Sequence, residues 1–378
     1  MGIDRRSFVK SLIPASAALS LSACASNGFS KGPKIVKKAD GGGDPRIRGP
    51  FPILSTPIEE SGAVDYETLC REAKFVGDCG ACGMIWPQSE DSVELLSVDE
   101  KLKGMELLAE TMRGEKAVIA FGCNGRNRED LVVYAKHVER LAAKYPEANI
   151  AIISRPPAEG KTRSDVMQYY LELEKHVDRP VIIQTGGGVP YRGPIPDVEM
   201  MIELAKRNPK VFGYIKEETG NADECNARMK REIEAKPHIH AVFSAWGGWQ
   251  WLYQSRQIGS EGLITERPAY SDLLAYIWEQ MENSDKYGTL NDAYSKYLLM
   301  LNLSYFVKGN THSDLRGPHL YVLQKRGIFK NRLSREFELV KGRRVVPKQT
   351  IVVNQELSQF QIDEIEACFS SLRPYLKL

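Results

Sequence analysis

The 378-residue sequence lacks a strong charge bias, an internal apolar run of membrane-spanning length and a complete zinc motif. It has 51 basic and 49 acidic side chains and a formal net charge of +2, so nothing favours nucleic acid as a partner. No internal apolar stretch approaches the roughly 18 residues that a transmembrane helix needs. Cys79 and Cys82 form one CxxC pair without a second, and we therefore expect no metal site.

The remaining composition is that of an ordinary globular protein. Hydrophobic residues make up 42% of the chain and charged residues 26%, which is typical of a soluble domain with a packed core. Cys79 and Cys82 fall where a helix is expected to run into a strand, and this favours two buried thiols. The alternative is a redox pair or a disulfide in an oxidising compartment.

The N-terminus resembles an export signal. Arg5 and Arg6 resemble the twin-arginine motif, a weakly apolar run follows over 12–21, and 21–24 (Leu-Ser-Ala-Cys) resembles a bacterial lipobox. We predict a signal over 1–24, lipidation of Cys24 and export by the twin-arginine route to a periplasmic or other extracytoplasmic location. The lipid would be the protein's only link to a membrane. The alternative is a cleaved signal without lipid.

The rest of the chain predicts alternating strands and helices. Residues 25–46, rich in Ser, Lys and Gly, predict a flexible tether. Apolar runs such as 118–121 do not alternate with polar residues, as expected of strands covered on both faces. After Asp65 and Asn127, apolar residues recur at helical spacing, and both side chains are placed to cap a helix. We expect strands at 49–56, 83–87, 117–123, 150–154, 180–185, 211–216, 241–245 and 262–265.

Eight such units predict an α/β fold, a closed (β/α)8 TIM barrel over 47–267, with its chemistry at the carboxyl ends of the strands. Residues 268–378 predict a C-terminal helical extension that ends in an amphipathic helix over 361–372.

Lys216 closes the sixth expected strand. Burial disfavours an ammonium ion and lowers its pKa, so a buried lysine can supply a neutral amine that forms a Schiff base with a ketone. We predict this catalytic role for Lys216; the alternative is a lysine that extends its ammonium to solvent. The neighbouring Glu217 and Glu218 either hold Lys216 or cap the next helix, and we favour capping.

Several motifs together resemble the dihydrodipicolinate synthase/N-acetylneuraminate lyase family of class I Schiff-base aldolases. They are 55–57 (Ser-Thr-Pro), 122–125 (Gly-Cys-Asn-Gly), 213–217 (Gly-Tyr-Ile-Lys-Glu) and the glycine-rich 259–265. The resemblance covers roughly 47–375. It implies a barrel with a C-terminal extension, no cofactor, a small keto acid or acidic sugar as ligand, and a homo-oligomer. It also implies that the backbone near Ile264 and Thr265 lines the keto-acid site.

The chain departs from the family's pattern at two strand ends. After the second strand, the family has two hydroxyl residues followed by Gly-Glu, which grip the substrate carboxylate. This chain instead offers Gln88, Ser89 and Glu90 as candidate ligands. At the end of the fifth strand, Gln184, followed by Thr185, stands where the family has a proton-transferring tyrosine, and an amide cannot act as an acid or base.

Other side chains could compensate for these losses. Tyr191 is a candidate replacement acid, and Arg192 could bind an acidic group with its guanidinium fork; the alternative is a loop pair that faces water. Arg155, after the fourth strand, is a second candidate partner for a carboxylate. Ser244 and Trp246 begin a tryptophan-rich segment that predicts either a stacking surface for a ligand or internal packing.

We therefore predict a divergent Schiff-base lyase or aldolase that acts on a 2-keto acid, and a sugar-derived keto-deoxy acid fits an exported enzyme. The alternatives are a sugar-acid dehydratase that uses the same imine and a non-catalytic protein that binds acidic sugars. A further alternative is a hydrolase that uses Glu90 and Asp91, in which Lys216 acts only through its charge.

Overall fold

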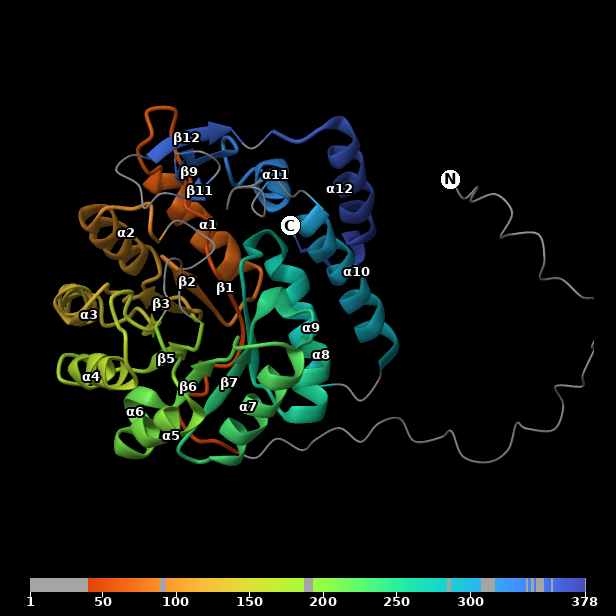
Figure 1. Ribbon diagram of the computed structural model, residues 1–378. Coiled ribbons are helices and arrows are strands. Elements are labelled where there is room, and N and C mark those ends of the chain that lie inside the picture. Colours follow the sequence, from red (N-terminus) through yellow and green to blue (C-terminus); the bar gives the residue numbers. More distant parts are fainter. Residues whose placement is uncertain are drawn as a thin grey trace, which may run out of the picture. The chain divides into compact units, whose positions relative to one another are not determined.

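The computed structural model describes residues 40–88, 93–186, 193–283, 287–306, 317–337, 339–340, 343–344, 350–354 and 356–377. In these ranges, eight parallel strands follow one another around a barrel. β1 pairs with β8, and a parallel bridge between Ile53 and Ile85 links the first two strands. This confirms the predicted (β/α)8 TIM barrel (Figure 1). The strands are β1 (Gly49–Pro52), β2 (Gly83–Trp86), β3 (Val118–Gly122), β4 (Ile150–Ser154), β5 (Val181–Gln184), β6 (Tyr214–Lys216), β7 (Ala241–Ser244) and β8 (Gly262–Thr265).

Apart from the short α6 and α8, the helices between the strands begin at capping side chains. Asp65 Oδ1 accepts a hydrogen bond from Thr68 N, and Asn127 Oδ1 accepts one from Asp130 N, each at 3.0 Å. Both caps confirm the prediction, because each satisfies a backbone N–H that the first helical turn leaves without an intrahelical partner. The helices are α1 (Tyr66–Asp78), α2 (Val98–Thr111), α3 (Arg128–Lys144), α4 (Arg163–Glu174), α5 (Val198–Arg207), α6 (Pro209–Phe212), α7 (Ala222–Glu234) and α8 (Trp251–Tyr253).

The sixth strand is shorter than its apolar run predicts. We expected it to begin at Val211, but Val211 and Phe212 belong to the short helix α6, and both of their N–H groups bond to Asn208 O. Pro209 favours this turn because its ring fixes φ in the helical range at the first position of a helix. Short apolar runs do not distinguish a strand from a buried helical turn.

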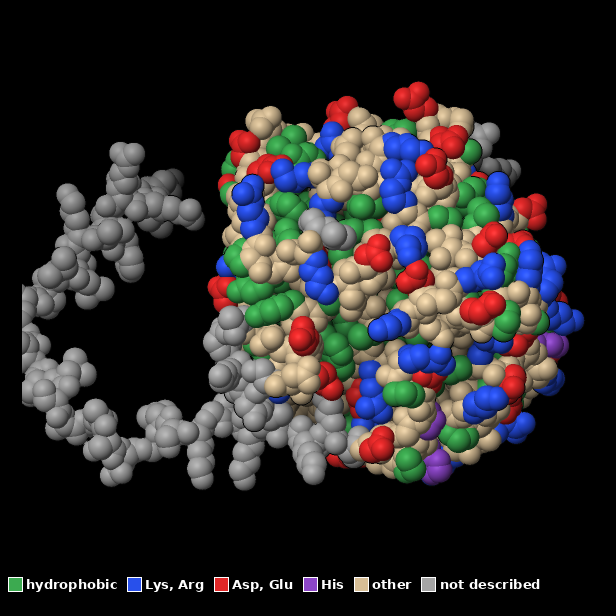
Figure 2. All heavy atoms as spheres, turned by 180° about the vertical axis from the view of Figure 1, so that it is seen from behind, with side chains coloured by type: hydrophobic (Ala, Val, Ile, Leu, Met, Phe, Trp, Pro, Cys, Tyr) green, Lys and Arg blue, Asp and Glu red, His purple; other side chains and the backbone are tan. Residues whose placement is uncertain are grey.

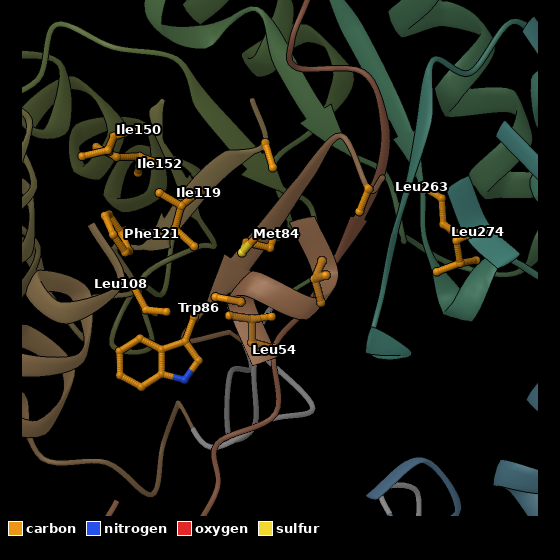
Figure 3. Close-up of a cluster of buried hydrophobic side chains, with 14 of the residues drawn as sticks. Leu54, Met84, Trp86, Leu108, Ile119, Phe121, Ile150, Ile152, Leu263 and Leu274 are labelled. Atoms are coloured by element: carbon orange, nitrogen blue, oxygen red, sulfur yellow. The ribbon is translucent and has the colours of Figure 1, made fainter. Parts of the chain in front are cut away.

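Apolar side chains fill two layers, one inside the barrel and one between the strands and the helices. Inside, the rings of Phe51 and Phe243 meet edge to face at 5.5 Å. In the outer layer, Trp86 at the end of β2 lies beside Leu108 of α2 (Figure 3). A Cβ added to Gly104 of α2 would lie 2.2 Å from Trp86 Cη2, so the indole requires a glycine at that position.

The C-terminal extension contains strands as well as the predicted helices. The helices α10 and α12 pack side by side (Figure 1). β9 pairs with β12, and β10 with β11, in antiparallel ladders that the irregular basic sequence did not indicate. The elements of the extension are α9 (Ser271–Asn283), α10 (Tyr287–Phe306), α11 (Gly317–Lys325), β9 (Leu333–Phe337), β10 (Leu339–Val340), β11 (Arg343–Arg344), β12 (Thr350–Asn354) and α12 (Gln359–Ser371).

The amino-terminal end of the barrel is covered by the residues that precede β1. We expected 25–46 to be a tether, yet Asp44 N donates to the hydroxyl of Tyr214 at 2.6 Å. The Gly41 carbonyl contacts Nδ1 of His240, and Ile47 is buried. From residue 41 onward, therefore, the chain packs against the amino-terminal ends of β6 and β7.

Cys79 and Cys82 are free thiols. Burial raises the pKa of Cys79 to about 12 and that of Cys82 to about 11. Both groups stay protonated at neutral pH and are poor nucleophiles. The expectation of two buried thiols holds for Cys79, whereas Cys82 is only partly buried.

Acidic, basic and apolar side chains are interspersed on the face shown in Figure 2. None of the helices in the described ranges combines the length and apolar character needed to cross a bilayer. The described residues also contain no group of three or more His, Cys, Asp or Glu side chains placed to hold a metal ion.

Candidate active site

Lys216 is the last residue of β6, at the carboxyl end of the barrel. Its side chain is 1% exposed, and in the sheet Lys216 pairs with Gln184 of β5 on one side and with Phe243 of β7 on the other. The amine nitrogen Nζ lies 2.9 Å from Oε2 of Glu218, whose side chain is 15% exposed. The predicted nucleophile is therefore buried at the mouth of the barrel, in contact with a carboxylate.

The Glu218 carboxylate connects Lys216 to Gln184. Gln184 Nε2 donates to Glu218 Oε1 at 2.6 Å and lies 3.3 Å from the Gly186 carbonyl. One carboxylate oxygen thus contacts the lysine amine and the other contacts the amide. Gly186 is required here, because a Cβ at this position would lie 2.2 Å from Glu218 Oε1.

Glu217 points away from the amine and is fully buried. Its Oε1 accepts hydrogen bonds from Thr185 Oγ1 at 3.0 Å and from Thr219 N at 2.7 Å, and its Oε2 accepts one from Arg228 Nε at 3.0 Å. The neighbouring acids thus have different roles, since one contacts Lys216 and the other orders the turn after β6.

The preference for helix capping by Glu217 or Glu218 was wrong. The cap of α7 is Asn221, whose Oδ1 accepts a hydrogen bond from Glu224 N at 3.0 Å. An asparagine immediately before the helix fits the capping geometry. Both glutamates are thereby left for contacts at the end of β6.

A buried acidic group lies behind Glu217. Glu232 of α7 is fully buried, and Arg228 Nη2 lies 4.0 Å from its Oε1. Burial, followed by repulsion from Glu217, raises the pKa of Glu232 well above its ordinary value of 4.5. Sequence reasoning missed this cluster, although the spacing of Arg228 and Glu232 is the usual signal for a helical pair.

The ends of β2, β3 and β4 are joined by a second polar network. Asn124 Nδ2 donates to Gln88 Oε1 at 3.0 Å, and Asn124 Oδ1 accepts from Arg155 N at 3.2 Å. The guanidinium of Arg155 forms an ion pair with Glu94. The predicted carboxylate partner Arg155 therefore already has an acidic partner within the chain.

Comparison with known proteins finds curated relatives of low identity and solved structures of the same fold. No protein-family model matches the chain. It is 25% identical over 209 residues to the 4-hydroxy-tetrahydrodipicolinate synthase of Bartonella bacilliformis, a match that covers 53% of this chain and 68% of the relative. Other curated synthases match over 57–61% of their own length.

Solved structures share the fold. The dihydrodipicolinate synthase of Aquifex aeolicus superposes with a TM-score of 0.66 at 18% identity, over 88% of this chain and 100% of its own. The sialic acid aldolase of Ruminococcus gnavus gives 0.66 at 15%, over 88% and 100%. The curated synthases and the shared fold support a divergent member of the dihydrodipicolinate synthase/N-acetylneuraminate lyase family.

Three other predicted site residues, Ser244, Ile264 and Thr265, are buried within the barrel. Ser244 Oγ lies 3.0 Å from Ser260 Oγ, and Thr265 Oγ1 lies 3.3 Å from the hydroxyl of Tyr297 in α10. Ile264 is fully buried in the interior layer. Their contacts with a ligand remain predictions.

The tryptophan-rich segment after β7 divides into two parts. Trp246 and Trp249 stack at 6.3 Å, and Trp249 is 49% exposed. Trp251 is fully buried and stacks on Trp278 of α9, so it belongs to the core. The hydroxyl of Tyr294 in α10 donates to the carbonyl of Trp249 at 2.9 Å, and the extension therefore helps to shape the barrel mouth.

Four predicted site residues, Ser89, Glu90, Tyr191 and Arg192, lie outside the described residues, as does Cys24. The structure does bring Lys216, Gln184 and Thr185 together at adjacent strand ends. Sequence reasoning missed Glu218 as the link between the first two.

Proposed function

We propose that this protein is a Schiff-base-forming lyase or aldolase that acts on a 2-keto acid through Lys216. The observation that carries the proposal is a lysine amine at the carboxyl end of β6, 1% exposed and in contact with a carboxylate, in a barrel of this family. Burial of a lysine amine costs free energy, and covalent catalysis is a function that requires an amine in such a position.

The reaction follows from the chemistry of the imine. The neutral amine adds to the keto carbon, and loss of water gives a protonated imine. The carbon–carbon bond of the substrate then breaks, its electron pair moves toward the cationic nitrogen, and the other fragment leaves with a new carbonyl group. Protonation of the enamine and hydrolysis return a smaller 2-keto acid and free Lys216.

The substrate class and the setting are parts of the same proposal. A sugar-derived keto-deoxy acid fits an enzyme exported by a twin-arginine signal and anchored through lipid on Cys24. A dehydratase that acts on a sugar acid would use the same imine. We also propose a homo-oligomer.

A binding protein for acidic sugars is the second candidate. The ion pair between Lys216 and Glu218 favours it, because a nearby carboxylate stabilises the ammonium ion, which cannot attack a ketone. In that case the lysine would bind an acidic ligand through its charge alone.

A covalent adduct between Lys216 and a 2-keto acid would distinguish the enzyme from the binding protein. Purified protein is incubated with pyruvate and sodium borohydride, and its peptides are analysed by mass spectrometry for a reduced pyruvyl group. We expect label on Lys216, and none after Lys216→Arg. The matched control is Lys101→Arg, because Lys101 is also buried and burial lowers its pKa to about 8. Absence of an adduct with pyruvate and with a panel of sugar-derived 2-keto acids would exclude the enzyme.

A further inference from the structure

The amine of Lys216 has almost no direct access to water, whereas Glu218 has some. The two side chains are 1% and 15% exposed, and Oε2 of Glu218 lies 2.9 Å from Nζ of Lys216. Formation of an imine requires one proton to leave the ammonium ion and another to reach the departing hydroxyl group. A group that hydrogen-bonds to the reacting nitrogen and also reaches solvent is suited to both transfers.

The neighbouring polar side chains do not meet these requirements. Gln184 carries an amide that does not titrate. Glu217 is fully buried, and its two oxygens accept hydrogen bonds from Thr185, Thr219 and Arg228. Within the described ranges, Glu218 is therefore a titratable neighbour with a carboxylate oxygen in contact with the amine.

Two hydrogen bonds hold Glu218 in this position. Gln184 Nε2 donates to its Oε1 at 2.6 Å. Its backbone N–H donates to Thr185 Oγ1 at 2.9 Å. Gly186 leaves the space for this arrangement, because a single methyl group there would displace the carboxylate. A charged side chain held at both its carboxylate and its backbone is pre-organised for proton transfer.

From this geometry, we propose that Glu218 is the catalytic acid–base of imine formation and that Gln184 positions it. The proposal rests on the function proposed for Lys216. It assigns the proton transfers to a residue of the turn after β6 and needs no tyrosine at the end of β5.

The proton balance closes without another reactant. The Glu218 carboxylate takes a proton from the Lys216 ammonium, and the neutral amine adds to the keto carbon to give a carbinolamine. The Glu218 carboxylic acid returns its proton to the hydroxyl group, which leaves as water. The products are a cationic imine on Lys216 and an anionic Glu218 beside it, so the total charge is unchanged and the new cation retains a counter-ion.

The test is the rate of imine trapping by borohydride with pyruvate as the probe, measured over a range of pH. We expect Glu218→Gln to slow trapping by about 10²- to 10⁴-fold, the usual contribution of general acid–base catalysis. Glu218→Asp should recover part of the rate because it keeps a carboxylate. The matched control is Glu224→Gln, a change of an exposed glutamate in the first turn of α7, which should leave the rate unchanged.

A second variant guards against a folding defect in Glu218→Gln. Gly186→Ala keeps every titratable group and places a methyl group against the Glu218 carboxylate, so it should also slow trapping. If the wild type forms an adduct and Glu218→Gln or Gly186→Ala traps pyruvate as fast, Glu218 is not the acid–base, while Lys216 keeps its role. If the wild type forms no adduct with any 2-keto acid, the proposed function fails and this assignment fails with it.

Discussion

Two threonines near Lys216 provide a sharp test of how the turn after β6 is held. The hydroxyl of Thr185 donates to Glu217 Oε1 at 3.0 Å and accepts from Glu218 N at 2.9 Å. The hydroxyl of Thr219 is also buried, but it has no hydrogen-bond partner among the described residues. Replacement of each by valine removes the same atom from two sites that lie close together.

We expect Thr185→Val to destabilise the protein by about 2–4 kcal/mol. It removes a hydrogen bond to a charged group, worth about 1.5–3 kcal/mol. It also leaves the partly buried N–H of Glu218 unpaired, at a cost of at most about 1–3 kcal/mol, and the two losses overlap in part. Thr219→Val should be neutral or stabilise by up to about 1 kcal/mol, because it removes a buried hydroxyl without a partner.

The assay is equilibrium unfolding in urea, followed by far-ultraviolet circular dichroism, for the wild type and both variants. The midpoint should fall for Thr185→Val and stay level or rise for Thr219→Val. Equal urea midpoints for the two variants would refute the reasoning, because the hydrogen bonds of the Thr185 hydroxyl would then add nothing to the free energy of unfolding. In the trapping assay, Thr185→Val should also form the imine more slowly, since it releases the Glu218 backbone.

Two further stability predictions follow from the helices. Gly104→Ala should destabilise the protein by about 1–3 kcal/mol, because the added methyl group overpacks against the indole of Trp86. At Gly77 of α1 the nearest atom would lie 3.7 Å from an added Cβ, so Gly77→Ala should stabilise the protein by about 0.5–1 kcal/mol. The melting temperatures measured by calorimetry should therefore shift in opposite directions, and equal shifts would contradict the packing described for Gly104. The raised pKa of Glu232 means that the folded state keeps a proton that the unfolded state releases, so wild-type stability falls as pH rises above about 4.5 toward the folded pKa. Residue 232 cannot titrate in Glu232→Gln, so the urea midpoint of this variant should rise relative to that of the wild type as pH increases above about 4.5. A difference in midpoint that does not change with pH would contradict the prediction.

The barrel was predictable from the sequence because its signals are local. Uninterrupted apolar runs and the caps Asp65 and Asn127 lie within single segments, so each is visible without knowledge of the fold. Lys216 was recognisable for the same reason, as it ends a short apolar run. The predicted start of β6 was wrong because an apolar run does not reveal whether its backbone is extended or forms a helical turn.

The link from Glu218 to Gln184 could not be found in this way. The two residues are 34 positions apart, and the direction of each glutamate after Lys216 depends on which neighbouring strand offers a donor. Gln184 donates to Glu218, and Thr185 donates to Glu217. Only the pairing of the strands in the folded barrel shows which carboxylate lies beside which donor. The tyrosines of α10 that reach the loop after β7 were hidden for the same reason.

The segment over 41–48 has a practical consequence for handling the protein. It enters at the end of the barrel where His240 and Tyr214 lie, opposite the tip of β6 that carries Lys216. An affinity handle attached upstream of it would leave from the far side of the fold, so copies captured on beads by that handle would keep their reactive face toward bulk solution.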